Sequence, residues 1–296
     1  MEWLQAHLPQ GVISVISFFS MFGEELLLVM IFGFLYWSWN KKTGRSVAMC
    51  LLLTQVWNPM IKNVFLRRRP YMDHEGIQIL RVVEPSADPM NISAQGYSFP
   101  SGHSSASLST FGMLAVKLRK RWMTVVAVAL PLLVGFSRVT VGAHYPTDVL
   151  GGWALALIGM GVVTLLEKHV PDCKKRYAVI LLLTLPGLFY CKSADYFSGL
   201  GLLVGFMAGT LFEEKYVQFE NTRDPVRAIL RVIVGGGIFL GLNSLLKLPF
   251  SKEFLSGGSY GALLIRLARY TLATFVMTGV YPIAFKYTAN IGKARK

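Results

Sequence analysis

The chain has 296 residues, of which 53% are hydrophobic and only 16% are charged, and its mean hydropathy is +0.47. These values exclude an ordinary soluble globular protein, because several apolar runs approach the ~20 residues that a membrane-spanning helix needs. The net charge of +14 does not indicate nucleic-acid binding, since the cations are concentrated in short segments between apolar runs. The three cysteines lie far apart, so neither a disulfide framework nor a zinc site is expected.

The N-terminal segment, residues 3–21, is apolar but is interrupted by Pro9, Gly11 and several serines. We expect this segment to lie in the membrane interface as an amphipathic element. It has no basic n-region and no obvious cleavage site, so no removable signal peptide is predicted. We interpret Glu24 and Glu25 as interfacial anchors at the start of the first spanning helix.

The remaining hydropathy pattern predicts an all-α polytopic bundle, in which residues 1–296 form a single membrane domain. About nine spanning helices are expected, at approximately residues 24–40, 46–66, 101–116, 122–137, 148–166, 177–190, 196–212, 228–246 and 261–287. Residues 67–97 form a polar loop that is long enough to cover a site. Glycines within the apolar runs, such as Gly151, Gly152 and Gly161, are expected to permit close contacts between helices.

Three polar motifs follow one another between residues 62 and 148. The first is KNVFLRRRP, which has the spacing K-x6-RP, the second is PSGH, and the third is SRVTVGAHYPTD, which has the spacing SR-x5-H-x3-D. They contain the candidate site residues Lys62, Arg69, Ser101, Gly102, His103, Arg138, His144 and Asp148.

PSGH precedes a run of small and apolar residues, so the motif predicts the start of a helix. Ser98 or Ser101 can cap this helix, and a proline is tolerated in its first turn. The unpaired backbone N–H groups and the positive end of the helix dipole would form an anion-binding site, which Gly102 allows an oxyanion to approach. Three cations add positive charge and hydrogen-bond donors suited to phosphate: Lys62, Arg69 and Arg138.

The spacing of His144 and Asp148 predicts that the carboxylate reaches one imidazole nitrogen and leaves the other free to attack. His103, at the predicted anion site, is positioned to protonate a leaving alkoxide. Two histidines with opposite roles and three cations favour phosphoryl transfer through a phosphohistidine, followed by hydrolysis. This chemistry requires no metal and no cofactor.

These three motifs resemble those of the type 2 phosphatidic acid phosphatase superfamily, and the resemblance covers about residues 62–148. It implies that His144 is the nucleophile, Asp148 its orienting partner and His103 the general acid. It also implies that the phosphoryl oxygens are bound by Lys62, Arg69, Ser101, Gly102 and Arg138. Two predicted spans precede the first motif. This arrangement is similar to the glucose-6-phosphatase and sphingosine-phosphate phosphatase branch, whereas the six-helix lipid phosphatases have three spans before the motif.

The distribution of charge predicts the orientation. Most lysines and arginines outside the motifs lie in alternate loops, at residues 41–45, 117–121, 168–176 and 213–227. We therefore assign these loops, together with the C-terminal KARK sequence, to the cytoplasm. The three motifs then share the extracytoplasmic face of a cell-membrane protein. The expected partners are the bilayer and a lipid phosphate or pyrophosphate; no nucleic acid is expected, and the sequence does not indicate an oligomeric state.

Several alternatives remain open at this point. The helix count is compatible with a phosphatase of a soluble sugar phosphate, and the motifs are compatible with a phosphotransferase or with a non-catalytic lipid-binding or transport protein. Arg67 and Arg68 give the site more positive charge than a monoester needs. They contact lipid headgroups at the interface, or one of them binds the second phosphate of a pyrophosphate.

Overall fold

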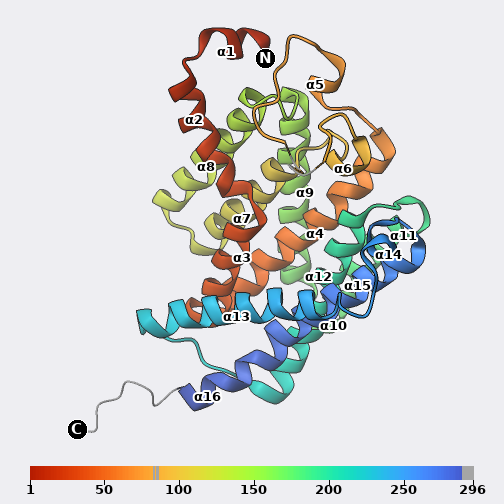
Figure 1. Cartoon of the computed structure of the whole chain (residues 1–296). Coiled ribbons are helices and arrows are strands. Elements are labelled where there is room, and N and C mark those ends of the chain that lie inside the picture. The colour runs from red at the N-terminus through yellow and green to blue at the C-terminus, as the bar shows by residue number, and fades with distance from the viewer. Residues whose placement is uncertain (83, 85–86, 289–296) are drawn as a thin grey trace. The chain divides into compact units, whose positions relative to one another are not determined.

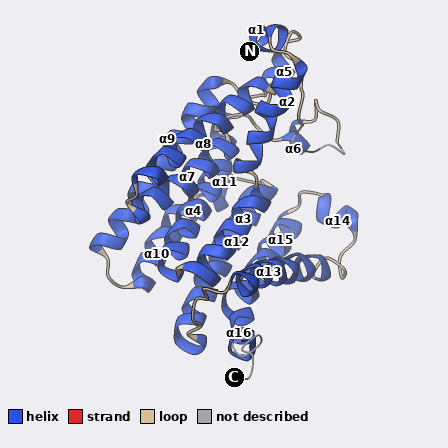
Figure 2. Ribbon diagram, turned by 90° about the vertical axis from the view of Figure 1, so that its left-hand side faces the viewer, coloured by secondary structure: helices blue, strands red, loops and turns tan. Residues whose placement is uncertain are grey.

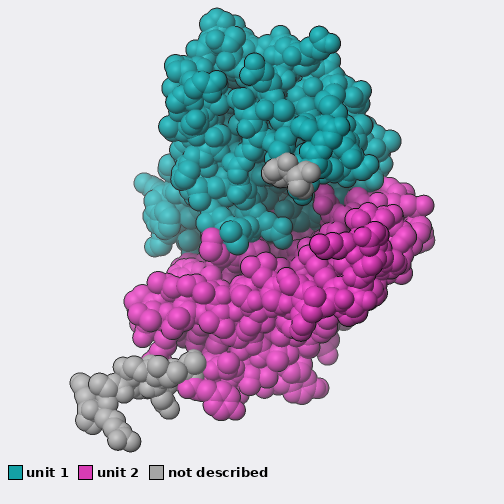
Figure 3. Space-filling view, in the orientation of Figure 1, with its two compact units in different colours: residues 1–28, 53–171 teal, residues 29–52, 172–296 magenta. Residues whose placement is uncertain are grey.

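The computed structural model describes residues 1–82, 84 and 87–288, and all regular elements among these residues are helices (Figures 1 and 2). The chain divides into two compact units, coloured separately in Figure 3. Unit 1 comprises residues 1–28 and 53–171, and unit 2 comprises residues 29–52 together with the described residues from 172 onward. All of the candidate site residues lie in unit 1.

Unit 1 contains the N-terminal elements and the central helices. Its elements are α1 (Glu2–His7), α2 (Gln10–Phe18), η1 (Phe19–Gly23), the start of α3 (Glu25–Phe34), the second half of α4 (Lys41–Phe65), α5 (Pro70–Asp73), α6 (Ile92–Gln95), α7 (Gly102–Leu118), α8 (Arg121–Thr140) and α9 (Pro146–His169). Helix α7 packs extensively against both α8 and α9.

Unit 2 contains the rest of α3 and the first half of α4, followed by the C-terminal elements. These elements are η2 (Leu35–Trp39), α10 (Cys173–Thr184), α11 (Gly187–Tyr190), α12 (Ala194–Phe212), η3 (Glu213–Val217), α13 (Pro225–Leu245), α14 (Lys252–Ser256), α15 (Tyr260–Phe275), η4 (Val276–Val280), η5 (Tyr281–Ile283) and α16 (Ala284–Thr288). Helices α12 and α15 pack closely along their lengths.

Five helical segments of the described chain are long and apolar enough to cross a membrane: 121–140, 146–169, 194–217, 225–245 and 260–287. A sixth candidate is a pair of segments, Gln10–Gly23 and Glu25–Trp39, bent by 49° at the break between them. The count of about nine spans is therefore not confirmed, because α7 has only 17 residues and α10 only 12. The KARK sequence, residues 293–296, lies outside the described residues.

Close packing of α9 against the start of α7 positions the site, and two glycines make it possible. A Cβ on Gly152 would lie 2.6 Å from the main-chain oxygen of Ser101, and one on Gly151 would lie 2.4 Å from the ring of Phe99. Both distances are too short for any real side chain, so the predicted role of this glycine pair in helix contact is confirmed. Gly161, farther along α9, has no neighbour within 4 Å of an added Cβ, so the prediction that it permits a close contact between helices was wrong.

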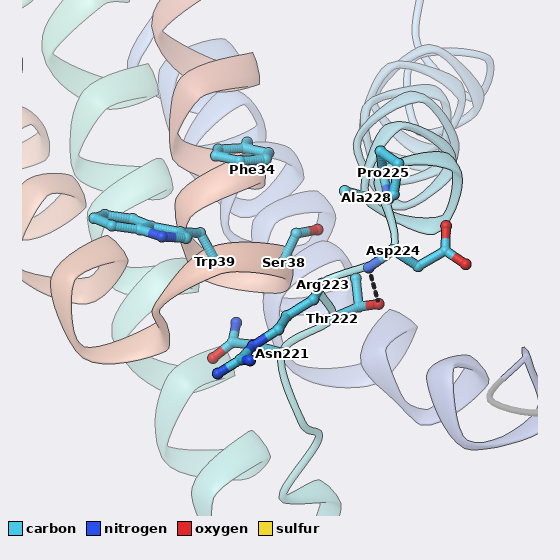
Figure 4. A pocket seen from close by; sticks show the side chains of 9 residues that line it. All are labelled: Phe34, Ser38, Trp39, Asn221, Thr222, Arg223, Asp224, Pro225 and Ala228. Atoms are coloured by element: carbon cyan, nitrogen blue, oxygen red, sulfur yellow. Dashed lines mark hydrogen bonds between the residues drawn. The ribbon is translucent and has the colours of Figure 1, made fainter.

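The interior of unit 2 contains a buried carboxylate that is compensated by two cations. Glu213 is fully buried and accepts hydrogen bonds from Lys41 at 2.6 Å and from Arg45 at 2.9 Å. A buried charge is tolerated only when it is paired in this way, so these contacts hold the start of α4 against the end of α12. Unit 2 also has a cavity of about 670 Å³, lined mainly by the end of η2 and by residues 221–228 (Figure 4).

Candidate active site

The PSGH motif forms a capped helix start, as the sequence predicts. Ser101 is the N-cap of α7, and its hydroxyl oxygen accepts a hydrogen bond from the main-chain N–H of Ser104. The preceding turn is held in place because the side-chain amide of Asn58 donates to the carbonyl of Pro100 at 3.1 Å. The backbone of Ser101 is fixed to α9 by a hydrogen bond of 2.9 Å from its N–H to the carbonyl of Asp148. The first turn of α7 therefore lies directly beside the start of α9.

His144 and Asp148 lie close together, in the orientation that their spacing predicts. The Nδ1 atom of His144 is 3.5 Å from Oδ2 of Asp148 and 3.4 Å from the hydroxyl of Ser98. Its Nε2 atom points the other way and lies 3.5 Å from a guanidinium nitrogen of Arg69. One nitrogen of the buried imidazole is thus held by an acceptor, and the other faces a cation.

Asp148 is fully buried and has several donors around it. Its Oδ2 atom accepts from the N–H of Tyr145 at 2.8 Å and from the hydroxyl of Ser98, and its Oδ1 atom accepts from Arg67 at 3.0 Å. The hydrogen bond from Tyr145 satisfies a free N–H group at the start of α9, so the same carboxylate caps this helix and contacts the imidazole of His144. Ser98, a candidate helix cap from the sequence, instead joins His144 to Asp148.

Arg69 is buried and connects two loops. Its guanidinium donates to the main-chain carbonyls of Gln95 and Gly96, at distances of 2.7–3.1 Å, and to that of Ala143 at 3.0 Å. The sequence predicts only a contact with phosphate. The side chain also anchors the long loop after α5 to the segment that carries His144, because carbonyls from both segments converge on one guanidinium.

Arg138 is delivered by the last turn of α8, as predicted, and is buried. One of its nitrogens donates to the hydroxyl of Ser20 at 3.4 Å, and its Nε atom has no hydrogen-bond partner within the described part of the chain. Ser20 in turn lies 2.6 Å from the hydroxyl of Ser137. The N-terminal segment therefore contributes to the site, whereas its composition predicts only a place in the membrane interface.

His103 occupies the first turn of α7, and η1 packs directly on it. A Cβ on Gly23 would lie 2.7 Å from the main-chain oxygen of His103 and 2.8 Å from its Cβ atom. No other residue type fits there without displacing the segment that carries His103. The apolar composition of residues 10–23 gave no signal of this contact, which only the tertiary packing reveals.

Burial and positive charge together set the protonation of His144. The imidazole lies in the segment between α8 and α9, and burial is the largest cause that lowers its pKa well below the usual value. The charges of Arg69, Arg138 and Lys62, which lies in the last turn of α4, lower it further. The three cations predicted from the motifs are therefore close enough to act on one histidine.

The additional arginines near the site already have acidic partners. Arg67 pairs with Asp148 and stacks on the ring of Tyr145 at 3.9 Å, and Arg68 lies 3.2 Å from Asp73. A third arginine that sequence reasoning missed, Arg81, forms an ion pair with Glu24.

These contacts define an electropositive, buried site at a helix N-terminus, with one histidine oriented by a carboxylate and a second histidine nearby. Such a site is suited to an oxyanion and to nucleophilic attack upon it. Within the described residues, no group of three or more His, Cys, Asp or Glu side chains is arranged to hold a metal ion. The fold therefore defines a helical, multi-pass membrane protein, and these contacts give it a candidate anion site.

Comparison with known proteins agrees with this class. Residues 43–170 match the PAP2 superfamily model, and residues 197–293 match a model described as the PAP2 superfamily phosphatase transmembrane extension. The chain belongs to the PAP2 superfamily, which is the type 2 phosphatidic acid phosphatase superfamily that the motifs resemble. No solved structure gives a significant match.

Three relatives indicate the range of similar proteins. An undecaprenyl-diphosphatase of Sulfolobus acidocaldarius is 27% identical over 47% of this chain and 62% of its own length. An undecaprenyl-diphosphatase of Bacillus subtilis is 35% identical over 35% of this chain and 47% of its own length. A lipid A 1-phosphatase of Rhizobium etli is 31% identical over 51% of this chain and 72% of its own length. The chain thus spans about half to three quarters of the length of these relatives.

Proposed function

We propose that this protein is a membrane-embedded phosphatase that hydrolyses a lipid phosphate or diphosphate through a phosphohistidine. The observation that carries the proposal is the orientation of His144, whose Nδ1 faces Asp148 while its Nε2 faces Arg69. The lipid substrate is supported by the relatives, which are named as undecaprenyl-diphosphatases and a lipid A phosphatase. A substrate that enters from the bilayer also suits a site framed by apolar helices.

In the first step, Nε2 of His144 attacks the terminal phosphorus. The bond between phosphorus and the leaving oxygen breaks, and His103 donates a proton to that oxygen. Asp148 accepts a hydrogen bond from the Nδ1–H of the nucleophile, so the proton stays on Nδ1, the attacking Nε2 carries the lone pair, and the imidazole keeps one orientation. Because burial and the surrounding cations keep the pKa of His144 low, the nucleophile is neutral at physiological pH.

The remaining polar groups stabilise the charge that develops on the phosphoryl oxygens. Lys62, Arg69 and Arg138 supply positive charge, and the Ser101 hydroxyl and the main-chain N–H groups that begin at Gly102 supply hydrogen bonds. In the second step water attacks the phosphorus of the phosphohistidine and gives a proton to His103, and the bond from phosphorus to Nε2 of His144 breaks, so that inorganic phosphate leaves. With this many fixed donors, the reaction is independent of a divalent metal.

We further propose that the active site faces the extracytoplasmic side of the cell membrane and that the C-terminus is cytoplasmic. In this topology α4, α7 and the segment formed by α10 and α11 also cross the membrane, which together with the five candidate spans and the bent pair gives the nine spans expected from the sequence. Helix α4, with 25 residues, is about 37 Å long, which exceeds the ~30 Å hydrocarbon thickness. Its basic first turn would then lie in the cytoplasm and Lys62 at the opposite end, near the site.

The test is phosphate release by the purified protein in detergent, with the His144→Ala variant as the control. The panel contains a prenyl diphosphate, a prenyl monophosphate, phosphatidate, a sphingoid phosphate and a hexose phosphate. We expect the lipid substrates to be turned over, the hexose phosphate to be poor, and an acid-labile phosphohistidine to be trapped only in the unaltered protein. Turnover by the variant at the unaltered rate, or hexose phosphate as the best substrate, would refute the proposal.

A further inference from the structure

The proposed mechanism does not use the ion pair between Arg81 and Glu24, and Glu24 adjoins Gly23, which packs on His103. Arg81, in the segment between α5 and α6, donates to the carboxylate of Glu24 and, at 3.3 Å, to the carbonyl of Ser17. The side chain of Arg81 is 41% exposed and that of Glu24 is 35% exposed. Both groups are therefore accessible to a ligand, unlike the buried cations deeper in the site.

The position of this ion pair follows from η1. Glu24 directly follows Gly23, whose Cα leaves no space for a side chain against His103. The same short helix supplies Ser20, which accepts a hydrogen bond from Arg138. Arg81 also interacts electrostatically with both His103 and Arg138. Glu24, and with it the ion pair, is therefore one residue from the contact of Gly23 with the proposed general acid, His103.

The neighbouring arginines are less suited to bind a further anion. Arg67 is bonded to the fully buried Asp148, and releasing it would leave that carboxylate without one of its donors. Arg68 is paired with Asp73, which ends the short helix α5. Arg81 is different, because its partner Glu24 is partly exposed and such an ion pair contributes little to stability, so the arginine can exchange partners readily.

We propose that Arg81 forms a second anion subsite, which binds the phosphate that stays on the lipid when a lipid diphosphate is hydrolysed. This inference rests on the proposed function and specifies its substrate class. When a diphosphate binds, its inner phosphate replaces Glu24 as the partner of Arg81 and makes charge-assisted contacts with the guanidinium. A monophosphate ester has no group at this place, so the Glu24–Arg81 pair stays closed.

The chemistry of the leaving group explains why the subsite lies near His103. His144 forms a bond to the terminal phosphorus, and the bond from that phosphorus to the bridging oxygen breaks. The bridging oxygen, with the proton of His103, departs as part of the lipid monophosphate. Arg81 stabilises the negative charge of this product, which an alcohol leaving group does not carry.

The test compares farnesyl diphosphate with farnesyl phosphate, because the two substrates share one lipid chain. For Arg81→Gln, we expect the ratio of kcat/KM for the diphosphate to that for the monophosphate to fall about 10–100-fold, as for loss of a charge-assisted contact. Glu24→Gln should not lower this ratio, since the variant removes only the competitor for Arg81. Arg68→Gln is the matched comparison, an exposed arginine with its own carboxylate partner, and should leave the ratio of the two kcat/KM values unchanged.

Thermal unfolding of each variant in detergent separates binding from folding. Equal losses on both substrates with Arg81→Gln, or a selective loss of diphosphate turnover with Glu24→Gln, would show that the ion pair is structural and would overturn the subsite. An unchanged ratio in Arg81→Gln would overturn it as well. Turnover of neither lipid by the unaltered protein would instead refute the proposed function, and the subsite with it.

Discussion

Gly152→Ala is expected to damage the site without altering any catalytic group. The added Cβ would lie 2.6 Å from the main-chain oxygen of Ser101, 3.1 Å from Cβ of Ser104 and 3.2 Å from the N–H of Ser105. An ordinary contact needs at least 3.4 Å, so α9 must move away from the start of α7 by about 0.8 Å, the difference between 3.4 and 2.6 Å. Since Ser101 cannot give way, the shift separates His144 from the anion site.

Two magnitudes follow from this displacement. Overpacking of this kind costs ~1–3 kcal/mol of folding free energy, against a gain of ~0.5–1 kcal/mol for replacing a glycine inside a helix. A misplacement of nearly 1 Å in a catalytic site reduces the rate by up to ~100-fold, so we expect kcat/KM to fall about 10–100-fold.

Gly161→Ala is the matched control, because it lies in the same helix and its added Cβ meets nothing within 4 Å. It should keep full activity and unfold at the same or a slightly higher temperature. The assay is phosphate release from a prenyl diphosphate, together with thermal unfolding of each variant in detergent. If both alanine variants behave alike, the close packing of α9 on the Ser101 turn is wrong.

Three further predictions concern the same site. Ser98→Ala should lower kcat/KM about 10–100-fold, because a hydrogen bond to a charged carboxylate is worth ~1.5–3 kcal/mol. The control, Ser107→Ala, removes a buried hydroxyl that is bonded within its own helix and should change kcat/KM less than about 3-fold. Similar effects of the two variants would exclude the role of Ser98. Because the pKa of His144 is lowered in the folded state, the contribution of His144 to the free energy of unfolding is complete above the unfolded-state pKa of about 6.5. This contribution is lost as the pH falls towards the folded-state pKa, by at most ~1.4 kcal/mol per pH unit. Unfolding between pH 7.5 and 5 should therefore depend less on pH in His144→Asn, and an identical dependence would contradict this assignment. Activity should persist in EDTA and be inhibited by vanadate, and loss of turnover on chelation that magnesium restores would reject the metal-independent mechanism.

Sequence reasoning succeeded where a local pattern determines the structure. The helix start at Gly102, the delivery of Arg138 by the last turn of α8 and the approach of His144 to Asp148 all depend on spacing within one segment. Turn chemistry and helical periodicity are enough to predict such features. The class of fold was equally accessible, because hydropathy alone separates a multi-pass helical protein from a globular one.

The contacts that sequence reasoning missed are all long-range. Ser98 is 46 residues from His144, Ser20 is 118 residues from Arg138, and Arg81 is 57 residues from Glu24. No periodicity connects such pairs, because they meet only when separate helices pack. The number of spans stays a prediction, since hydropathy does not register that α10 ends at Thr184, before Pro186, and that a separate short helix follows.

The carboxylate of Asp148 has a consequence for how the protein matures. Because this carboxylate both caps α9 and contacts His144, the proposed nucleophile cannot be oriented before the first turn of α9 has formed and docked beside Ser101. A newly inserted chain with every helix in the bilayer but α9 undocked would contain all of its catalytic residues and yet remain inactive. The rate of phosphate release would then be proportional to the number of correctly assembled molecules, so measuring this rate would be a direct assay of membrane-protein assembly.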